Sequence, residues 1–150
     1  MGKITEILKA AQQRAKELNL PYEGALLPEE AYEIFQSAPG SKIVDVRTRA
    51  ELDWVGRIPG AEAVEWVTYP GMNPNPHFLA QLGQVADKES LVMFLCRSGV
   101  RSHSAAVSAT QAGYTDCYNV LEGFEGDKDA ENQRNSLNGW RAAELPWEQS

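Results

Sequence analysis

The residues best suited to chemistry stand together in CRSGVRS, residues 96–102. Cys96 directly follows an apolar run, and Arg97 and Arg101 bracket Gly99 just after it. Nearby cations and helix N-termini favour the ionised form of cysteine, which is the nucleophile. We therefore expect Cys96 to be largely a thiolate at neutral pH. A buried structural cysteine is the alternative, but it does not need two arginines and a glycine close by.

The segment after Cys96 is also suited to binding an anion. The run LVMFL at 91–95 predicts a strand, and a helix is expected from about Ser102 to Ala112. Ligands of parallel α/β sheets bind outside the carboxyl ends of the strands. Backbone N–H groups of a loop that leads into a helix form an anion site there. Gly99 allows the unusual backbone angles that such a loop needs.

The loop length separates two reactions. Phosphatases with a cysteine nucleophile generally show C-x5-R, whereas Cys96 and Arg101 form the shorter C-x4-R. A tighter loop fits a single sulfane sulfur carried on the cysteine. The spacing favours sulfur transfer and disfavours a phosphatase or an arsenate reductase.

Four polar residues near this loop are candidates for a supporting role. Asp45 and Arg47 follow the apolar start of KIVDV, a predicted strand, and either orient the arginines of the loop or tie the sheet edge to the turn at 56–61. Ser102 and His103 open the predicted helix after the loop. His103 either lines the mouth of the pocket or is a solvated residue of the first helical turn.

The second cysteine, Cys117, is expected in the core. It begins a predicted strand, and in a parallel sheet this places it at the edge opposite Cys96. A resolving thiol for Cys96 is the alternative. The spacings among Cys96, His103 and Cys117 match no zinc pattern, so no metal site is expected.

Composition restricts the partners. The chain has 150 residues, 43% of them hydrophobic and 23% charged, as in one ordinary globular domain. Its net charge of −7 argues against nucleic acid and anionic membranes, which are bound through clustered Lys and Arg. No apolar run approaches the roughly 20 residues of a membrane span. With no signal-peptide pattern and only two cysteines, we expect a cytoplasmic protein.

Helical and strand patterns alternate along the chain. Helices are predicted at 4–18, 28–36, 49–54, 77–86 and 102–112, and strands at 42–46, 63–67, 91–95 and 117–121. This order predicts an α/β fold whose mainly parallel sheet carries helices on both faces.

The two ends of the chain are predicted to be additions to this sheet. Residues 1–24 form a helical extension that either packs on the domain or contributes to a homodimer. Residues 25–150 form the domain, including a wrapped tail. The tail is expected to be anchored by Trp140, Leu145, Pro146 and Trp147.

Four segments in the right order resemble the single-domain form of the rhodanese-like, or thiosulfate sulfurtransferase, family over about residues 25–147. They are CRSGVRS (96–102), IVDVRTRAELDWVGRIPGA (43–61), NVLEGFEG (119–126) and GWRAAELPW (139–147). Two positions depart from the family pattern: Arg57 stands where His is common, and Glu144 where Gly is common.

The resemblance implies a five-stranded sheet and a two-step reaction. Cys96 takes the outer sulfur of thiosulfate or a similar small anionic donor, and the persulfide passes it to cyanide, a thiol or a protein. The side chains of Arg97 and Arg101 attract the donor, with no metal or organic cofactor. A non-catalytic sulfur-binding or interaction module is the alternative. The backbone N–H groups implied to stabilise the persulfide are those of Arg97, Ser98, Gly99, Val100 and Arg101.

Overall fold

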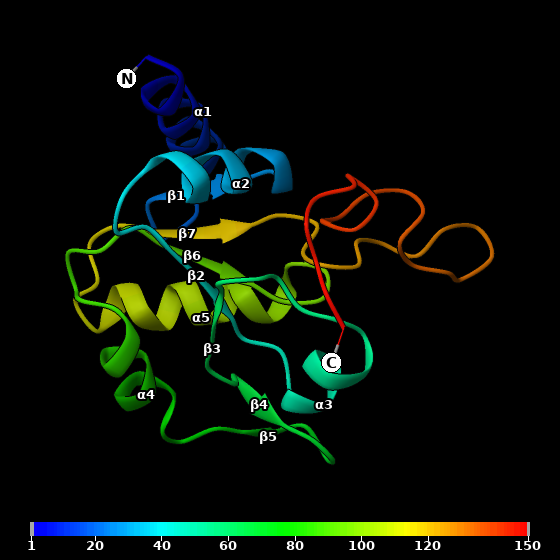
Figure 1. The fold of residues 1–150 in the computed structure, drawn as a ribbon. Helices are drawn as coiled ribbons and strands as arrows, with labels where there is room; N and C mark the ends of the chain where they lie inside the picture. The colour runs from blue at the N-terminus through cyan, green and yellow to red at the C-terminus, as the bar shows by residue number, and fades with distance from the viewer. Residues whose placement is uncertain (1, 150) are drawn as a thin grey trace.

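A five-stranded parallel sheet lies at the centre of the computed structural model, which describes residues 2–149 (Figure 1). In spatial order the strands are β1 (Gly24–Leu26), β7 (Cys117–Val120), β6 (Val92–Leu95), β2 (Lys42–Asp45) and β3 (Glu62–Ala63). A separate antiparallel hairpin pairs β4 (Val67–Thr68) with β5 (Asn73–Pro74). The helices are α1 (Gly2–Glu17), α2 (Pro28–Ser37), α3 (Arg49–Trp54), α4 (Phe78–Val85) and α5 (Val100–Gln111). The expected α/β fold with a five-stranded, mainly parallel sheet is confirmed.

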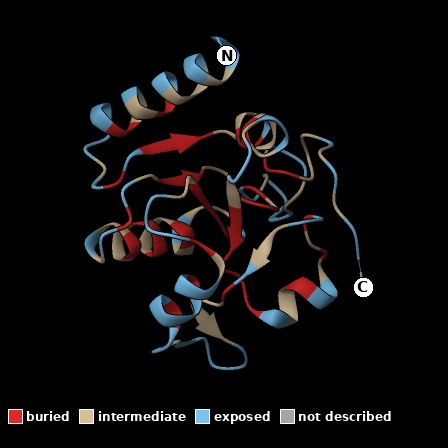
Figure 2. Ribbon diagram, turned by 60° about the vertical axis from the view of Figure 1, so that its left-hand side comes forward, coloured by how far each residue is buried: buried red, intermediate tan, exposed pale blue. Residues whose placement is uncertain are grey.

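Both faces of the sheet are covered because successive strand residues point to opposite sides. In β6, Phe94 packs with residues of α4 and α5, such as Leu82 and Ala105. Its neighbours Met93 and Leu95 belong to a second cluster with residues of α1 and α2. All four residues of β6 are buried, and the sheet is the most continuously buried part of the ribbon (Figure 2). The continuous apolar run at 91–95 therefore reflects burial on two sides.

The helix α1 packs on its own chain. Ala11 and Ala15 on its inner face are buried, and Figure 2 shows its outer face exposed beyond β1. Arg14 joins it to α2 through two hydrogen bonds to Glu30, at 2.6 and 2.9 Å. This matches the packed alternative for the N-terminal helix, while the homodimer and the division into 1–24 and 25–150 stay predictions. Within residues 2–149 no helix has the length and apolar character needed to cross a bilayer.

Three elements differ from their sequence-based predictions. The strand expected at 63–67 is split, because Asn75 donates its side-chain amide to the Glu65 carbonyl and its backbone N–H to the Trp66 carbonyl, which turns the chain away from the sheet. The helix expected from Ser102 begins two residues earlier, directly after Gly99. Strand β1 was not predicted, since three residues are too short to show a period.

The C-terminal segment folds back onto the domain as a wrapped tail, which ends beside α3 (Figure 1). Trp140 is fully buried, and its indole N–H donates to the Pro146 carbonyl at 2.8 Å. Trp147 meets Phe124 edge to face at 6.2 Å. Glu144 takes a left-handed backbone conformation with φ of 61°, which explains why glycine suits this position.

A buried ion pair ties the end of β2 to the following turn. Arg47 is fully buried, and its guanidinium donates to Asp45 at 2.7 and 2.9 Å and to the Gly56 carbonyl at 2.8 Å. The guanidinium also lies over the Phe124 ring, 4.2 Å from its centroid. Of the two roles predicted for Asp45 and Arg47, these contacts correspond to the structural one, in which the pair connects the edge of the sheet to the turn at 56–61.

Replacing Asp45 with asparagine is expected to lower the free energy of unfolding by about 3–5 kcal/mol, because it leaves the buried Arg47 charge uncompensated. Urea denaturation measures this. Asp53→Asn is the control, since its pair with Arg57 is exposed and such pairs contribute less than about 1 kcal/mol. Equal losses in the two variants would contradict a structural role for the buried pair.

Candidate active site

Cys96 lies at the carboxyl edge of the sheet, one residue beyond β6. It is 1% exposed, and its Sγ accepts the backbone N–H of Gly99 at 3.1 Å. The Ser102 Oγ, in the first turn of α5, lies 3.3 Å from the same sulfur. The peptide chain thus curls around the thiol, as the loop sequence predicted.

Gly99 allows this curl. It has φ of 104°, a left-handed conformation that strains residues with a β-carbon, and it is the N-cap of α5. The first N–H groups of a helix have no partner within the helix. The N–H groups of Val100, Arg101 and Ser102 therefore open α5 directly after the Cys96 loop, where the helix dipole favours negative charge.

A second segment holds the outer side of the loop. The N–H groups of Phe124 and Glu125 donate to the carbonyl oxygens of Cys96 and Arg97 at 2.8 and 2.9 Å. Gly123 makes this approach possible, because a β-carbon there would lie 2.5 Å from the Cys96 carbonyl oxygen. The loop carbonyls are therefore bound on the side of this segment.

Asn119 connects the loop to the central sheet. It is 3% exposed on β7, and its Oδ1 accepts the Ser102 hydroxyl proton at 2.6 Å. Its Nδ2 donates to the Gly99 carbonyl at 3.2 Å. A hydroxyl has one proton. With that proton directed to Asn119, Ser102 presents a lone pair to Cys96, and the thiol S–H is the donor between them.

Arg101 is paired across the site with a residue of α3. Its two terminal nitrogens donate to the two carboxylate oxygens of Glu51 at 2.7 and 2.8 Å. Glu51 also accepts from the Thr48 backbone N–H and hydroxyl, completing the capping box of α3. Burial by itself raises the pKa of Glu51, but the bonds and charge of Arg101 and the bonds from Thr48 outweigh it and lower that pKa to about 2.

Arg97 differs from Arg101 in its surroundings. Its side chain is exposed and, within residues 2–149, takes part in no hydrogen bond or ion pair. The positive charge of Arg97 is therefore open to solvent, whereas Arg101 is already neutralised by Glu51. Attraction of an anionic donor by both side chains stays a prediction, and Arg97 has the free charge for it.

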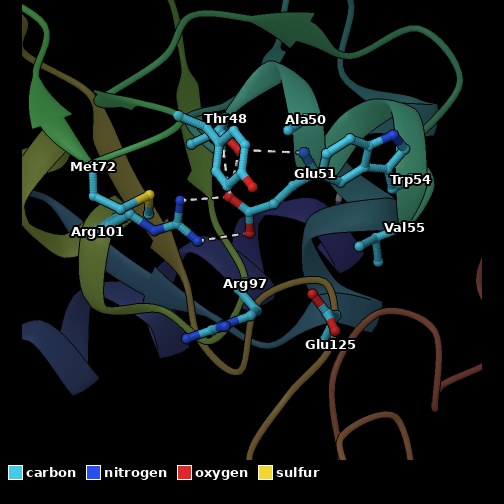
Figure 3. A pocket seen from close by; sticks show the side chains of 10 residues that line it. Thr48, Ala50, Glu51, Trp54, Val55, Met72, Arg97, Arg101 and Glu125 are labelled. Carbon is cyan, nitrogen blue, oxygen red and sulfur yellow. Dashed lines mark hydrogen bonds and ion pairs between the residues drawn. The ribbon is translucent and has the colours of Figure 1, made fainter.

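A cavity of about 380 Å³ opens beside the loop (Figure 3). It is lined by Thr48, Ala50, Glu51, Trp54, Val55, Tyr69, Met72, Arg97, Arg101 and Glu125. Residues on both sides of Gly99 in the Cys96 loop are thus part of its wall. The wall combines the ion pair of Arg101 and Glu51 with apolar side chains from α3 and from the segment between β4 and β5.

The remaining candidates lie outside this wall. Ser98 is half-buried within the loop, and Val100 is 73% exposed at the start of α5. His103 is turned to Tyr22, whose hydroxyl lies 2.7 Å from His103 Nδ1. Burial raises the pKa of Tyr22, and a hydrogen bond with Asn119 partly offsets this. Tyr22 therefore links His103 with the residues that support the loop.

Cys117 is far from the thiol of Cys96. It is paired with Val92, four residues before Cys96 on β6, which is about 13 Å at the rise of a strand. Burial raises its pKa to about 11, and both cysteines are free. Among the residues that the structure describes, no group of three metal-ligating side chains is present.

Sequence reasoning missed two residues that support the Cys96 loop, Glu51 and Asn119. Thr48 and Glu51 have the T-x-x-E spacing of a capping box, which marks the start of α3 but not the contact with Arg101. Asn119 is a polar residue inside the otherwise apolar run CYNVL, and that mismatch was the available signal. Both contacts span many residues, 50 for Glu51 and 17 for Asn119.

The Glu51 interaction predicts a pH-dependent stability difference. Glu51→Gln is expected to lower the free energy of unfolding by about 1.5–3 kcal/mol at pH 7, because bonds to a charged group are lost. The folded pKa, about 2, lies below the ordinary value of 4.5, so this contribution is complete above pH 4.5 and is lost as pH falls towards 2. Urea titrations of native and variant protein should therefore converge over that range. The exposed Glu6→Gln is the control, and a constant difference would contradict the interaction.

The Asn119 contacts predict an effect on thiol reactivity. Asn119→Ala is expected to speed alkylation of Cys96 by iodoacetamide by up to about tenfold, because the released Ser102 hydroxyl proton can donate to Sγ and stabilise the thiolate. Competition kinetics at neutral pH measure this, with Asn138→Ala as the control because that side chain binds Asp127 in a surface loop. Unchanged reactivity in Asn119→Ala would mean that Asn119 only stabilises the fold.

Known proteins resemble this chain in sequence and in structure. The family model of the Rhodanese-like domain matches residues 27–130. An uncharacterised protein from Rickettsia conorii is 39% identical over 121 residues, which are 79% of this chain and 92% of that protein. The crystal structure of Rv0390 from M. tuberculosis is 44% identical, covers 86% of this chain and 99% of its own, and has a TM-score of 0.79. The solution structure of a polysulfide-sulfur transferase homodimer from Wolinella succinogenes is similar in fold alone, at 20% identity and a TM-score of 0.59, over 95% of this chain and 85% of that one. The chain therefore belongs to the rhodanese-like family.

Proposed function

We propose that this protein is a sulfurtransferase that carries a sulfane sulfur on Cys96. The observation that carries the proposal is the Gly99 N–H donated to Sγ at the N-terminus of α5. N–H groups and a helix dipole at this place stabilise a negative sulfur. Thiosulfate or a similar small anion is the donor, and the exposed charge of Arg97 attracts it.

The reaction proceeds in two displacements. The Cys96 thiolate attacks the outer sulfur of thiosulfate, a bond between Sγ and that sulfur forms, and the bond to the sulfite sulfur breaks with its electron pair. Sulfite leaves and Cys96 holds a persulfide. A nucleophilic acceptor, a thiol or cyanide, then takes the outer sulfur and returns the electron pair to Cys96. Neither step needs a metal or an organic cofactor.

A reducing compartment suits this chemistry, because Cys96 must be a thiolate to accept sulfur and both cysteines are unpaired. The cytoplasm is such a compartment, and we propose it as the site of the reaction. A small sulfur donor and a thiol or protein acceptor are the partners, while the acidic chain is unsuited to nucleic acid.

Intact-mass spectrometry after brief incubation with thiosulfate tests the proposal. The native chain is expected to gain one sulfur atom, and Cys96→Ser to gain none. Cys117→Ser is the matched control and should gain the sulfur like the native chain, because Cys117 lies at the other end of the strands. Release of that sulfur on addition of cyanide completes the cycle.

Two outcomes would contradict the proposal. If neither thiosulfate nor a polysulfide adds sulfur, while Cys96 still alkylates, the thiol serves another reaction. Hydrolysis of an aryl phosphate that is abolished in Cys96→Ser would then favour the phosphatase. A stable persulfide that passes sulfur to no acceptor would favour a binding module.

A further inference from the structure

The cavity beside the Cys96 loop has no net formal charge. Its wall holds two cations, Arg97 and Arg101, and two anions, Glu51 and Glu125. Glu51 binds Arg101 through both carboxylate oxygens, so one cation is neutralised at contact distance. An extended ligand with anionic groups along this wall gains little net attraction, because Glu51 and Glu125 oppose the two arginines, whereas a small donor anion can approach the exposed charge of Arg97 alone.

The rim of the same cavity is unusually apolar for this acidic chain. Trp54, Tyr69 and Met72 line it and are 68%, 56% and 47% exposed. The labelled side chains of Trp54 and Met72 are drawn at the cavity in Figure 3. The Trp54 and Tyr69 rings meet edge to face at 5.7 Å. Exposed apolar side chains grouped beside a pocket mark a place where a ligand is bound.

One member of the ion pair and one member of the apolar rim come from the same short helix. Glu51 and Trp54 are three residues apart on α3, so they lie on neighbouring positions of one helical face. The Thr48 cap fixes the start of this helix through its bonds with Glu51. The helix α3 therefore contributes to both the charge and the shape of the cavity beside the Cys96 loop.

We infer that the sulfur acceptor is a small thiol of low negative charge with an aromatic or aliphatic arm, which packs against Trp54, Tyr69 and Met72. This inference rests on the proposed function and names the substrate of its second step. A cavity of about 380 Å³ lies in the range of small-molecule sites. Glu125 and Glu51 are specificity-determining residues that disfavour acceptors with anionic arms.

The transfer step balances without a further reactant. The acceptor thiol loses its proton to solvent, and its thiolate attacks the outer sulfur of the Cys96 persulfide. A sulfur–sulfur bond forms on the acceptor, the bond to Cys96 Sγ breaks, and the electron pair returns to Cys96 as a thiolate. The acceptor leaves as a persulfide.

Stopped-flow transfer from persulfide-loaded native protein tests this inference. The acceptors are phenylmethanethiol, 2-mercaptoethanol and 3-mercaptopropionate, with rates normalised to the thiolate concentration. We expect the aromatic thiol to react at least about tenfold faster than 2-mercaptoethanol, the discrimination that a small apolar contact provides. The carboxylate thiol is expected to be the slowest.

Two variants assign the effect to residues. Trp54→Ala should slow phenylmethanethiol far more than 2-mercaptoethanol, so that the preference for the aromatic thiol is lost. Leu137→Ala is its control, because Leu137 is 62% exposed and lies outside this cavity. Glu125→Gln should raise the rate of 3-mercaptopropionate relative to that of 2-mercaptoethanol, by about two- to fivefold for one charge near a solvated surface.

The outcomes separate this inference from the proposed function. If no persulfide is loaded, the proposed function fails, and the inference fails with it. If the persulfide forms but the three thiols react equally, or Trp54→Ala slows all three alike, the inference is wrong and the sulfurtransferase stands. A cysteine peptide that outcompetes phenylmethanethiol tenfold would overturn the small-molecule acceptor in favour of a protein.

Discussion

The fixed direction of the loop peptides is the constraint on which the rest of the site depends. The carbonyl groups of Cys96 and Arg97 are bound by Phe124 and Glu125. A carbonyl oxygen turned to the sulfur would repel negative charge, so this hold leaves the Gly99 N–H to face Sγ. The segment after β7 therefore decides what the loop after β6 can do.

The sequence predicted the Cys96 loop more completely than the residues of other elements that contact it. Cys96 and its glycine loop were visible because strand, loop and helix are consecutive in the chain. The partners Glu51 and Asn119 were not, since their contacts depend on how α3 and β7 pack against that loop. The strand predicted at 63–67 is interrupted for a similar reason, a contact with a distant residue. Asn75, from a later turn, binds the carbonyl groups of Glu65 and Trp66 that a continuous strand would use for pairing.

Burial on two faces explains why the fold itself was predictable. Strand β6 is a continuous apolar run, β2 and β7 are partly apolar and mainly buried, and the helices between them carry apolar residues at helical spacing. Short elements lack this signal. Strand β1 has three residues and joins the sheet through its pairing with β7, which no local pattern records.

In the proposed reaction the backbone stabilises the carried sulfur, and the side chains select the acceptor. In that proposal the sulfur carried on Cys96 is stabilised by backbone N–H groups such as that of Gly99, which need no side-chain charge. The ion pair of Arg101 and Glu51 can therefore neutralise the cavity wall without removing the groups that stabilise a persulfide. If both arginines were needed to stabilise the sulfur, their charges could not also be neutralised in the cavity wall. If the main chain stabilises the carried sulfur as we propose, the side chains of the cavity are free to select the acceptor by shape and by apolar contact.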